Sequence, residues 1–171
     1  MSDYLLEAQD VAMHFGGVKA LDGVDFRLRK GELRCLLGPN GAGKSTFFRC
    51  LTGTYKPTRG HILFKGSDIA GKERHDIARA GIGVKTQVPS LFDGLTAHEN
   101  LWLALRTVQS ATARKEKIAD VMERVGISSL SGHILGRMAH GQRQLVELAM
   151  VVASDPDLVL LDEPAAGMTD G

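Results

Sequence analysis

The sequence lacks a strong charge excess, a long apolar run and a recognisable export signal. Its net charge is +1 over 171 residues, so no overall field favours nucleic acid or an anionic membrane as a partner. No apolar run approaches the roughly 20 residues that span a bilayer. The longest candidate, residues 145–153, is interrupted by Glu147. The first residues do not combine a basic region with an apolar stretch, so we expect a cytoplasmic protein.

Cysteine is scarce as well, with Cys35 and Cys50 the only two. Cys35 falls in the apolar segment 33–37, which predicts a short buried strand, and Cys50 falls in a helix predicted from residue 46 onward. We therefore expect two small buried thiols in a reducing compartment. A disulfide or a metal-binding pair is not expected.

The most informative feature that is present is a glycine-rich loop that fits the pattern G-x-x-x-x-G-K-[ST]. Its glycines let successive peptide N–H groups turn inward toward phosphates. Lys44 adds a charge that can reach the β- and γ-phosphates, and the Ser45 hydroxyl can bind Mg²⁺. The loop and the residue after it are Gly38, Pro39, Asn40, Gly41, Ala42, Gly43, Lys44, Ser45 and Thr46.

The alternative for this loop is an ordinary glycine-rich turn that carries a surface lysine. The predicted strand before the loop and the predicted helix after it favour phosphate binding, because a helix N-terminus attracts anions. The sequence thus predicts a protein that binds a nucleoside triphosphate.

Around this loop, the first thirty residues alternate in the manner of a β-meander with turns at glycine. A short strand is predicted at 61–64, a helical segment at 76–80 and a buried strand at 82–84. These elements indicate an antiparallel start followed by an α/β core.

From about residue 90 the pattern becomes helical. Thr96 and Glu99 have the spacing of a capping box, and a later apolar stripe at helical spacing ends before Gly126. A third helix is predicted at about 141–153, and the apolar run 158–161 predicts a strand buried on both faces.

Two carboxylates, Asp162 and Glu163, follow that last strand. Ligands bind at the carboxyl ends of parallel strands, where one acid can hold Mg²⁺ and a second can polarise an attacking water. An acidic pair after a strand is otherwise a common solvated loop. The phosphate loop upstream favours the functional interpretation.

Four segments occur in the order found in ATP-binding-cassette (ABC) ATPases, which the whole chain resembles. They are 38–46, Gln87, 138–144 and 160–164. The resemblance implies a P-loop NTPase core of the α/β class, with a mixed β-sheet flanked by helices and an N-terminal antiparallel β-subdomain. It implies one nucleotide-binding domain over 1–171, with a helical subdomain inserted at about 90–145.

The resemblance also assigns roles. Phe15 would stack on adenine, although an aromatic at a strand end is also a common core residue. Gln87 would contact Mg²⁺ and the attacking water, and would sense a membrane partner. Lys44 and the surrounding amides would hold the phosphates, with Ser45 on Mg²⁺. Asp162 would hold Mg²⁺ through water, and Glu163 would act as the general base.

The signature segment of the family is matched by Ala139, His140, Gly141 and Gln142. It would begin a helix and face the ATP of a second subunit. The family usually has Leu-Ser where this chain has Met138-Ala139, so a hydroxyl bond worth about 1.5–3 kcal/mol is missing. The similar segment 130–133 lacks the helix start that should follow it.

Family members also continue well beyond the equivalent of Gly171, so we expect a domain that is incomplete at its C-terminus. A histidine that contacts the γ-phosphate belongs to that further part, and none of the six histidines follows Glu163. Little turnover is therefore expected of this chain alone.

Segments 15–24, 140–142 and 164–169 resemble importers of branched-chain amino acids and of urea or short amides. That resemblance implies ATP and Mg²⁺ as cofactors and a second ATPase subunit, identical or different. It also implies membrane permease subunits at the inner face of the plasma membrane and, indirectly, an extracytoplasmic solute-binding protein. Nucleic acid is not expected as a partner. Two alternatives remain, a nucleotide-gated module that has lost catalysis and a non-transport ABC ATPase.

Overall fold

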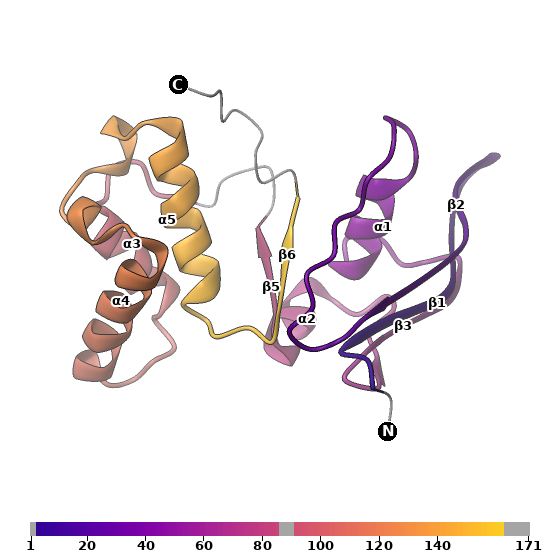
Figure 1. Cartoon of the computed structure of the whole chain (residues 1–171), viewed down its shortest axis with the longest axis horizontal. Helices are drawn as coiled ribbons and strands as arrows, with labels where there is room; N and C mark the ends of the chain where they lie inside the picture. The colour runs from indigo at the N-terminus through magenta and orange to yellow at the C-terminus, as the bar shows by residue number, and fades with distance from the viewer. Residues whose placement is uncertain (1–2, 86–90, 163–171) are drawn as a thin grey trace. The chain divides into compact units, whose positions relative to one another are not determined.

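The computed structural model describes residues 3–85 and 91–162, which form two compact units, Met1–Ile82 and Gly83–Gly171 (Figure 1). Gln87 and Glu163 therefore lie outside the described residues. Across the described ranges, every helix is too short or too polar to cross a membrane.

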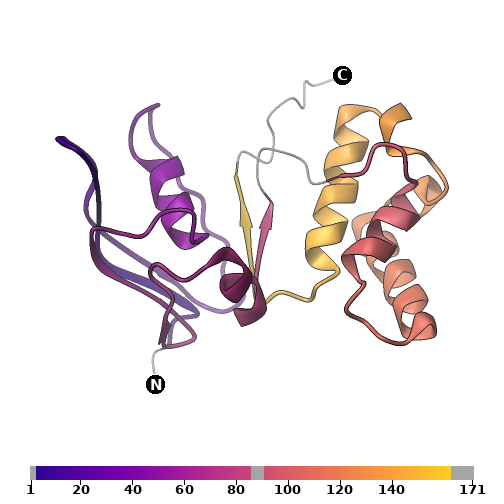
Figure 2. The ribbon, with the colours of Figure 1, turned by 180° about the vertical axis from the view of Figure 1, so that it is seen from behind.

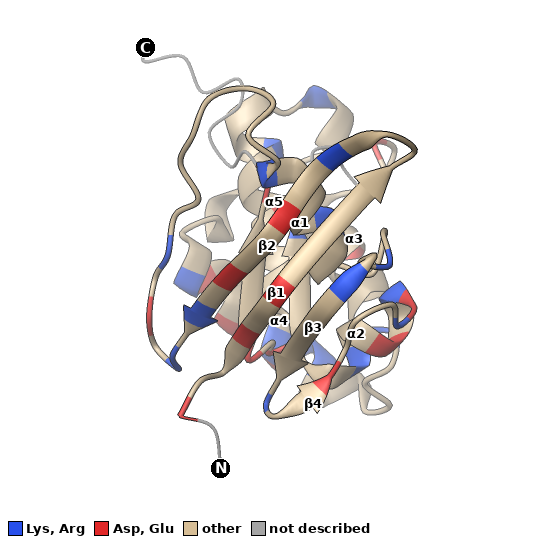
Figure 3. Cartoon of the chain, turned by 90° about the vertical axis from the view of Figure 1, so that its right-hand side faces the viewer, with Lys and Arg blue, Asp and Glu red and all other residues tan. Residues whose placement is uncertain are grey.

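The first unit is built on a four-stranded antiparallel sheet with the order β2-β1-β3-β4 (Figure 3). The predicted meander is confirmed, because β1 (Leu6–Phe15) and β2 (Val18–Leu28) form a hairpin. Its two-residue turn begins at Gly16, where φ is +56°. β3 (Arg59–Phe64) and β4 (Ser67–Asp68) complete the sheet.

One face of this sheet forms the core of the first unit. Leu6 pairs with Phe64 and Ala8 with Ile62, and all four side chains are buried, as the two-residue period of strands requires. Helices α1 (Lys44–Leu51) and α2 (Arg74–Ala80) add further apolar side chains to this core.

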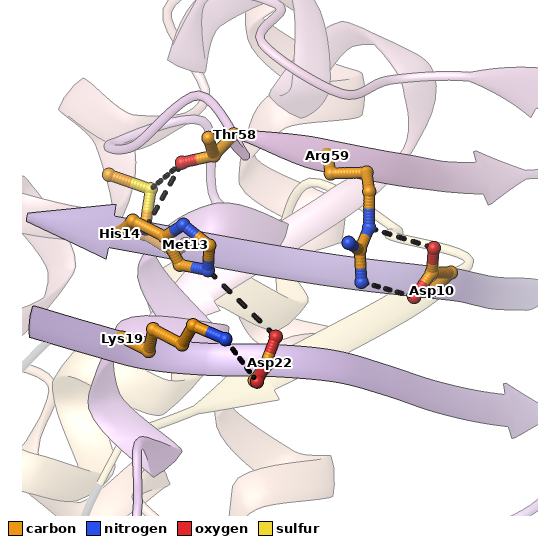
Figure 4. A network of polar contacts seen from close by, with 7 residues as sticks. All are labelled: Asp10, Met13, His14, Lys19, Asp22, Thr58 and Arg59. Carbon is orange, nitrogen blue, oxygen red and sulfur yellow. Dashed lines mark hydrogen bonds and ion pairs between the residues drawn. The ribbon is translucent and has the colours of Figure 1, made fainter.

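The other face of the sheet carries polar contacts between strands (Figure 4). The Arg59 guanidinium pairs with Asp10 at 2.9 Å, and the His14 N–H donates to Thr58 Oγ1 at 3.0 Å. A bulge at Asp10 needs Gly60 beside it, because a Cβ there would lie 2.3 Å from the Asp10 carbonyl oxygen.

The second unit contains three helices that pack against one another: α3 (Ala97–Ala104), α4 (Ala111–Val125) and α5 (His140–Val152) (Figure 2). Two 3₁₀ turns, η1 (Ser128–Leu130) and η2 (Leu135–Arg137), lie between α4 and α5. The buried apolar core of these elements consists of Ala97, Leu101, Leu105, Ile118, Val121, Met122, Ile127, Leu135, Val146, Ala149 and Ala153.

Local signals predicted these helices correctly. The capping box between Thr96 and Glu99 is formed in both directions, and α4 ends at Gly126 with φ of +77°. Trp102 of α3 packs at the edge of the core, stacked with His98 and with the Arg114 guanidinium 4.5 Å from its ring centroid.

Strands β5 (Ile82–Lys85) and β6 (Leu158–Leu161) pair side by side and point the same way (Figure 1). Their predicted positions are confirmed, but the expected burial of β6 on both faces is wrong. Leu158 is 8% exposed and Leu161 is 40% exposed, because β5 is the one strand paired with β6 in the part of the chain that the structure describes.

The strand predicted at 33–37 is also absent. No strand of residues 3–85 or 91–162 pairs with this segment, so Leu33 and Leu37 are 90% and 91% exposed. A run of this kind is buried when it lies in a sheet whose two faces are both covered. Cys35 is consequently exposed, against expectation, whereas Cys50 is buried as predicted.

Candidate functional site

The phosphate-loop candidate runs between residue 38 and the first turn of α1 in the first unit. Gly41 and Gly43 have φ of +82° and +85°, a region that strongly favours glycine. Gly43 is also the N-cap of α1, and a Cβ there would lie 2.6 Å from the Ala20 carbonyl oxygen. Glycine is therefore required at position 43 both by the left-handed backbone conformation and by the nearby Ala20 carbonyl oxygen.

The Lys44 ammonium lies across this loop. It donates to the carbonyl oxygens of Gly38 at 2.7 Å and Pro39 at 2.8 Å. No acidic residue occurs in the first turn of α1, so Lys44 and the helix N-terminus combine their positive charge. Ser45 follows in that turn and is exposed. The loop can thus receive an anion with a hydroxyl ligand beside it.

The helix behind the loop is anchored firmly. Phe47, Phe48 and Leu51 are buried, and the Phe47 ring meets Phe26 of β2 edge to face at 5.8 Å. The Phe47 N–H donates to the Gly43 carbonyl at 2.8 Å, which begins the helical ladder. The loop therefore rests on a rigid element, as a site for a charged ligand needs.

Phe15 ends β1 in the same unit and is 42% exposed. Its ring meets Tyr55 edge to face at 5.2 Å, and Arg49 donates to the Tyr55 hydroxyl. Part of the Phe15 ring is thus accessible, which a core aromatic would not be. Sequence reasoning missed Tyr55, which no local pattern marks as a neighbour of Phe15.

The signature segment opens α5 in the second unit, with Ala139 as N-cap. The Ala139 N–H donates to Gln142 Oε1 at 3.1 Å, but Ala139 has no side-chain oxygen to return the bond. Gly141 lies in the first turn, and the His140 ring contacts Gln144 Nε2 at 2.9 Å. One of the two bonds of a full capping box is therefore missing here.

A cavity of about 500 Å³ adjoins this segment, and sequence reasoning did not find it. Two basic side chains contribute to its wall, which is lined by Ser129, Gly132, His133, Ile134, Arg137, Met138 and Gln142. Its residues come from both sides of η2, so their proximity depends on the fold. Met138 and Gln142 belong to the signature segment, but no sequence motif marks the cavity as a whole.

The third candidate segment is the end of β6. The Asp162 N–H donates to the Lys85 carbonyl at 3.1 Å, which brings Asp162 beside the last residue of β5. Asp162 is half-buried, and Gln87 follows Lys85 two residues later in the sequence. Of the predicted catalytic and metal residues, the structure thus describes Lys44 and Ser45 in one unit and Asp162 in the other.

The family model of ABC transporters matches residues 21–166, a range that includes the loop, the signature segment and Asp162. The chain belongs to the ABC transporter family. The family and fold class predicted from the sequence are thereby confirmed.

Curated ABC relatives align over almost the whole chain. A high-affinity branched-chain amino acid transport ATP-binding protein, BraF of Pseudomonas aeruginosa, is 35% identical over 98% of this chain and 72% of its own length. LivG of Escherichia coli, named for the same transport, is 36% identical with the same coverage. A xylose import ATP-binding protein, XylG of Moorella thermoacetica, is 36% identical over 99% of this chain and 35% of its own.

Solved ABC cassettes have the same fold. The ADP conformation of MJ1267, an ATP-binding cassette of an ABC transporter, superposes with a TM-score of 0.87 at 30% identity. That match covers 98% of this chain and 72% of the other. A nucleotide-free cassette gives a TM-score of 0.84 at 30% identity, over 96% of this chain and 70% of the other.

Proposed function

We propose that this chain is the ATP-binding and ATP-hydrolysing subunit of an importer for branched-chain amino acids, or for urea or short amides. The observation that carries the proposal is the loop at Gly43 and Lys44. The backbone at Gly43 has a conformation and a close contact that only glycine fits, and the Lys44 ammonium lies across the loop, so that the two together suit an anion. The names of BraF and LivG support the amino acid class, and XylG shows that similar cassettes also serve sugar import.

In this proposal the nucleotide is held by the first unit. Phe15 contacts adenine, and the amides and ammonium from Gly38 to Thr46 hold the phosphates. Ser45 would bind Mg²⁺ directly, Gln87 would contact it, and Asp162 would hold it through water.

When bound, Mg²⁺ neutralises charge on the β- and γ-phosphates. We assign the remaining chemistry to side chains of this chain. Glu163 accepts the proton of the attacking water, Gln87 orients that water, and Lys44 stabilises charge on the γ-phosphate.

The signature residues Ala139, His140, Gly141 and Gln142 would act on the nucleotide of a second ATPase subunit. In this arrangement the helical part at about 90–145 is the inserted subdomain. The subunit pair would bind membrane permease subunits at the inner face of the plasma membrane. An extracytoplasmic solute-binding protein would deliver the solute to those permease subunits.

Replacement of Lys44 tests the proposal. Lys44→Ala should lower the affinity for MgATP at least about tenfold, because it removes the charge that reaches the β- and γ-phosphates. Isothermal titration calorimetry would measure the affinity. Lys72→Ala is the matched control, since it removes the same charge from an exposed position of the first unit. Equal affinity of the two variants would contradict the phosphate-loop assignment.

A second candidate is a nucleotide-gated module without catalysis. Ala139 favours it, because the N-cap of α5 has no hydroxyl for a partner's γ-phosphate. Steady-state phosphate release distinguishes the two candidates when the chain is paired with an intact partner subunit. Release that depends on Glu163 supports the hydrolytic subunit, and its absence supports the module.

A further inference from the structure

Helix α5 carries two charged residues four positions apart, Arg143 and Glu147, which therefore share one face of the helix. Each forms an ion pair with a residue that flanks the segment 86–90. Glu147 pairs with Lys85 on one side of it, and Arg143 pairs with Asp93 on the other. The helix that begins at the signature segment is thus tied to both flanks of the segment that contains Gln87.

The pair between Lys85 and Glu147 is almost sealed from solvent. Lys85 Nζ lies 3.1 Å from Glu147 Oε2, with 7% and 9% of the two side chains exposed. Two buried charges tolerate little displacement, because separation would leave each one without water or a partner. This contact holds the end of β5 in register with the second turn of α5.

The pair between Asp93 and Arg143 is more open but is supported by the backbone. Arg143 Nη2 lies 2.6 Å from Asp93 Oδ1, with 27% of the Arg143 and 62% of the Asp93 side chain exposed. The Gly136 N–H donates to the Asp93 carbonyl at 2.9 Å. Asp93 is therefore held both by α5 and by the turn before it.

Further backbone bonds extend this attachment beyond Asp93. The Leu135 N–H donates to the Leu95 carbonyl at 3.0 Å, and the Ala97 N–H donates to the His133 carbonyl at 3.1 Å. Thr96 and Ile134 form an antiparallel bridge between these bonds. The chain that follows residue 90 is thus joined to the chain that leads into the signature segment.

Phe92, the residue before Asp93, is held by the buried side-chain amide of Asn100. Asn100 is fully buried, and its side chain accepts from the Phe92 N–H at 2.8 Å and donates to the Phe92 carbonyl at 3.1 Å. All these contacts lie within the second unit. The two charged pairs join α5 to the flanks of 86–90 beside the apolar packing of Val151 near Gly83 and of Leu91 against the helical core.

We propose that Arg143 and Glu147 are positioning residues of ATP hydrolysis, an inference that rests on the proposed function. They act through Asp93 and Lys85, so a displacement of the helix that starts at Ala139 reaches both flanks of Gln87 together. Neither residue contacts the reacting atoms. The pairs therefore set the hydrolysis rate and leave the binding of MgATP unchanged.

Kinetics of the intact ATPase assembly test this role, through kcat, KM and the affinity for MgATP. Arg143→Ala and Asp93→Asn should each lower kcat about fivefold or more while KM and affinity stay within about twofold. Because both remove one contact, the double variant should be no slower than either single one. The reciprocal exchange Asp93→Arg with Arg143→Asp should restore kcat to within about twofold of the unsubstituted assembly.

The matched control is Lys117→Ala. Its ion pair with Asp155 lies in the same unit and has nearly the same exposure, 28% and 63%, but does not touch the flanks of 86–90. It should leave kcat unchanged. Glu147→Gln extends the test to the buried pair. If that variant does not fold, the Asp93–Arg143 cycle still decides.

Unchanged kcat in Arg143→Ala and Asp93→Asn would overturn the inference while leaving the Lys44 result intact. A parallel loss of affinity would also overturn it, because the pair would then serve binding. MgATP affinity that is unaffected by Lys44→Ala would overturn the proposed function, and the inference with it. An unsubstituted assembly that binds MgATP but releases no phosphate would overturn the positioning role together with the hydrolytic part of the proposed function, and would leave the assignment of nucleotide binding intact.

Discussion

Gly43 and Ala20 are in direct contact: a Cβ on Gly43 would lie 2.6 Å from the Ala20 carbonyl oxygen. The phosphate loop is therefore fitted against strand β2, and the fit depends on a residue without a side chain. Gly41 has nearly the same φ, yet a Cβ there would meet nothing within 4 Å. An alanine at Gly41 would therefore introduce backbone strain alone, whereas an alanine at Gly43 would introduce both backbone strain and a steric clash.

We expect Gly41→Ala to lower the free energy of unfolding by about 1–2 kcal/mol, the cost of a left-handed conformation. Gly43→Ala should cost a further amount of about 1–3 kcal/mol, since the loop must also move away from β2. Chemical denaturation followed by circular dichroism measures both. Equal losses in the two variants would show that the Ala20 contact does not constrain the loop.

The buried pair between Lys85 and Glu147 predicts an asymmetric response to substitution. Lys85→Met should destabilise the protein by about 3–5 kcal/mol, because Glu147 remains buried without its partner. The double variant Lys85→Met with Glu147→Leu should recover most of that loss. Arg124→Ala, which removes an exposed pair from α4, is the control and should cost less than about 1 kcal/mol. A double variant as unstable as Lys85→Met would contradict the pairing.

The cap of α3 predicts a dependence of stability on acid. Hydrogen bonds from the Thr96 N–H and then the Thr96 hydroxyl hold the pKa of Glu99 below its ordinary value of 4.5. A lowered pKa in the folded state contributes stability above the ordinary value, and this is lost as pH falls through the folded value. Thr96→Ala should cost about 1 kcal/mol near neutral pH and reduce this acid-dependent loss in part, because the hydroxyl donor is removed while the backbone N–H still donates to Glu99.

Ser110→Ala is the matched control, because it removes the N-cap of α4, whose first turn has no acidic residue. It should lower stability by a similar amount at every pH. Unfolding free energies between about pH 3 and pH 7 would test both variants. The same acid slope in Thr96→Ala as in the unsubstituted protein would contradict the contribution of the Thr96 hydroxyl to the lowered pKa of Glu99.

The two cysteines should differ in reactivity. Burial raises the pKa of the Cys50 thiol to about 11, so it stays protonated and shielded near neutral pH, whereas Cys35 is exposed. Brief maleimide treatment followed by mass spectrometry should add one label to the folded chain and two to the unfolded chain. Absence of any label on the folded chain would mean that residues 33–37 are covered.

The raised pKa of Cys50 also has a consequence at alkaline pH. Between the ordinary value of 9.0 and about 11, the unfolded thiol loses its proton while the folded thiol keeps it. Stability should therefore fall as pH rises through this window, with no contribution near neutral pH. Cys50→Ser, which does not titrate in this range, is the comparison, and its unfolding free energy should lack that part of the slope.

How much could be predicted from the sequence depended on how local each signal was. The capping box at Thr96, the stop at Gly126 and the hairpin turn at Gly16 are set by neighbouring residues, and each was found correctly. The segment 33–37 failed because apolar composition indicates burial without naming the strands that must provide it. The exposure of Leu161 has the same origin.

The site shows the same division. The loop around Lys44 is a contiguous motif, so its residues were recognised together. The pair between Asp93 and Arg143 joins positions fifty apart in sequence, and no local pattern connects them. Tyr55 beside Phe15 was missed for the same reason. The roles assigned to Gln87 and Glu163 come from motif resemblance and stay predictions, because both lie outside the described residues.

The stacked Trp102 has a practical consequence for how this chain can be observed. It is the only tryptophan, and it belongs to the second unit, while both tyrosines, Tyr4 and Tyr55, belong to the first. Tryptophan fluorescence, when it is excited selectively, therefore reports on the helical unit and carries no signal from the tyrosines of the sheet unit. The melting of the helical unit can thus be followed by itself, without any label.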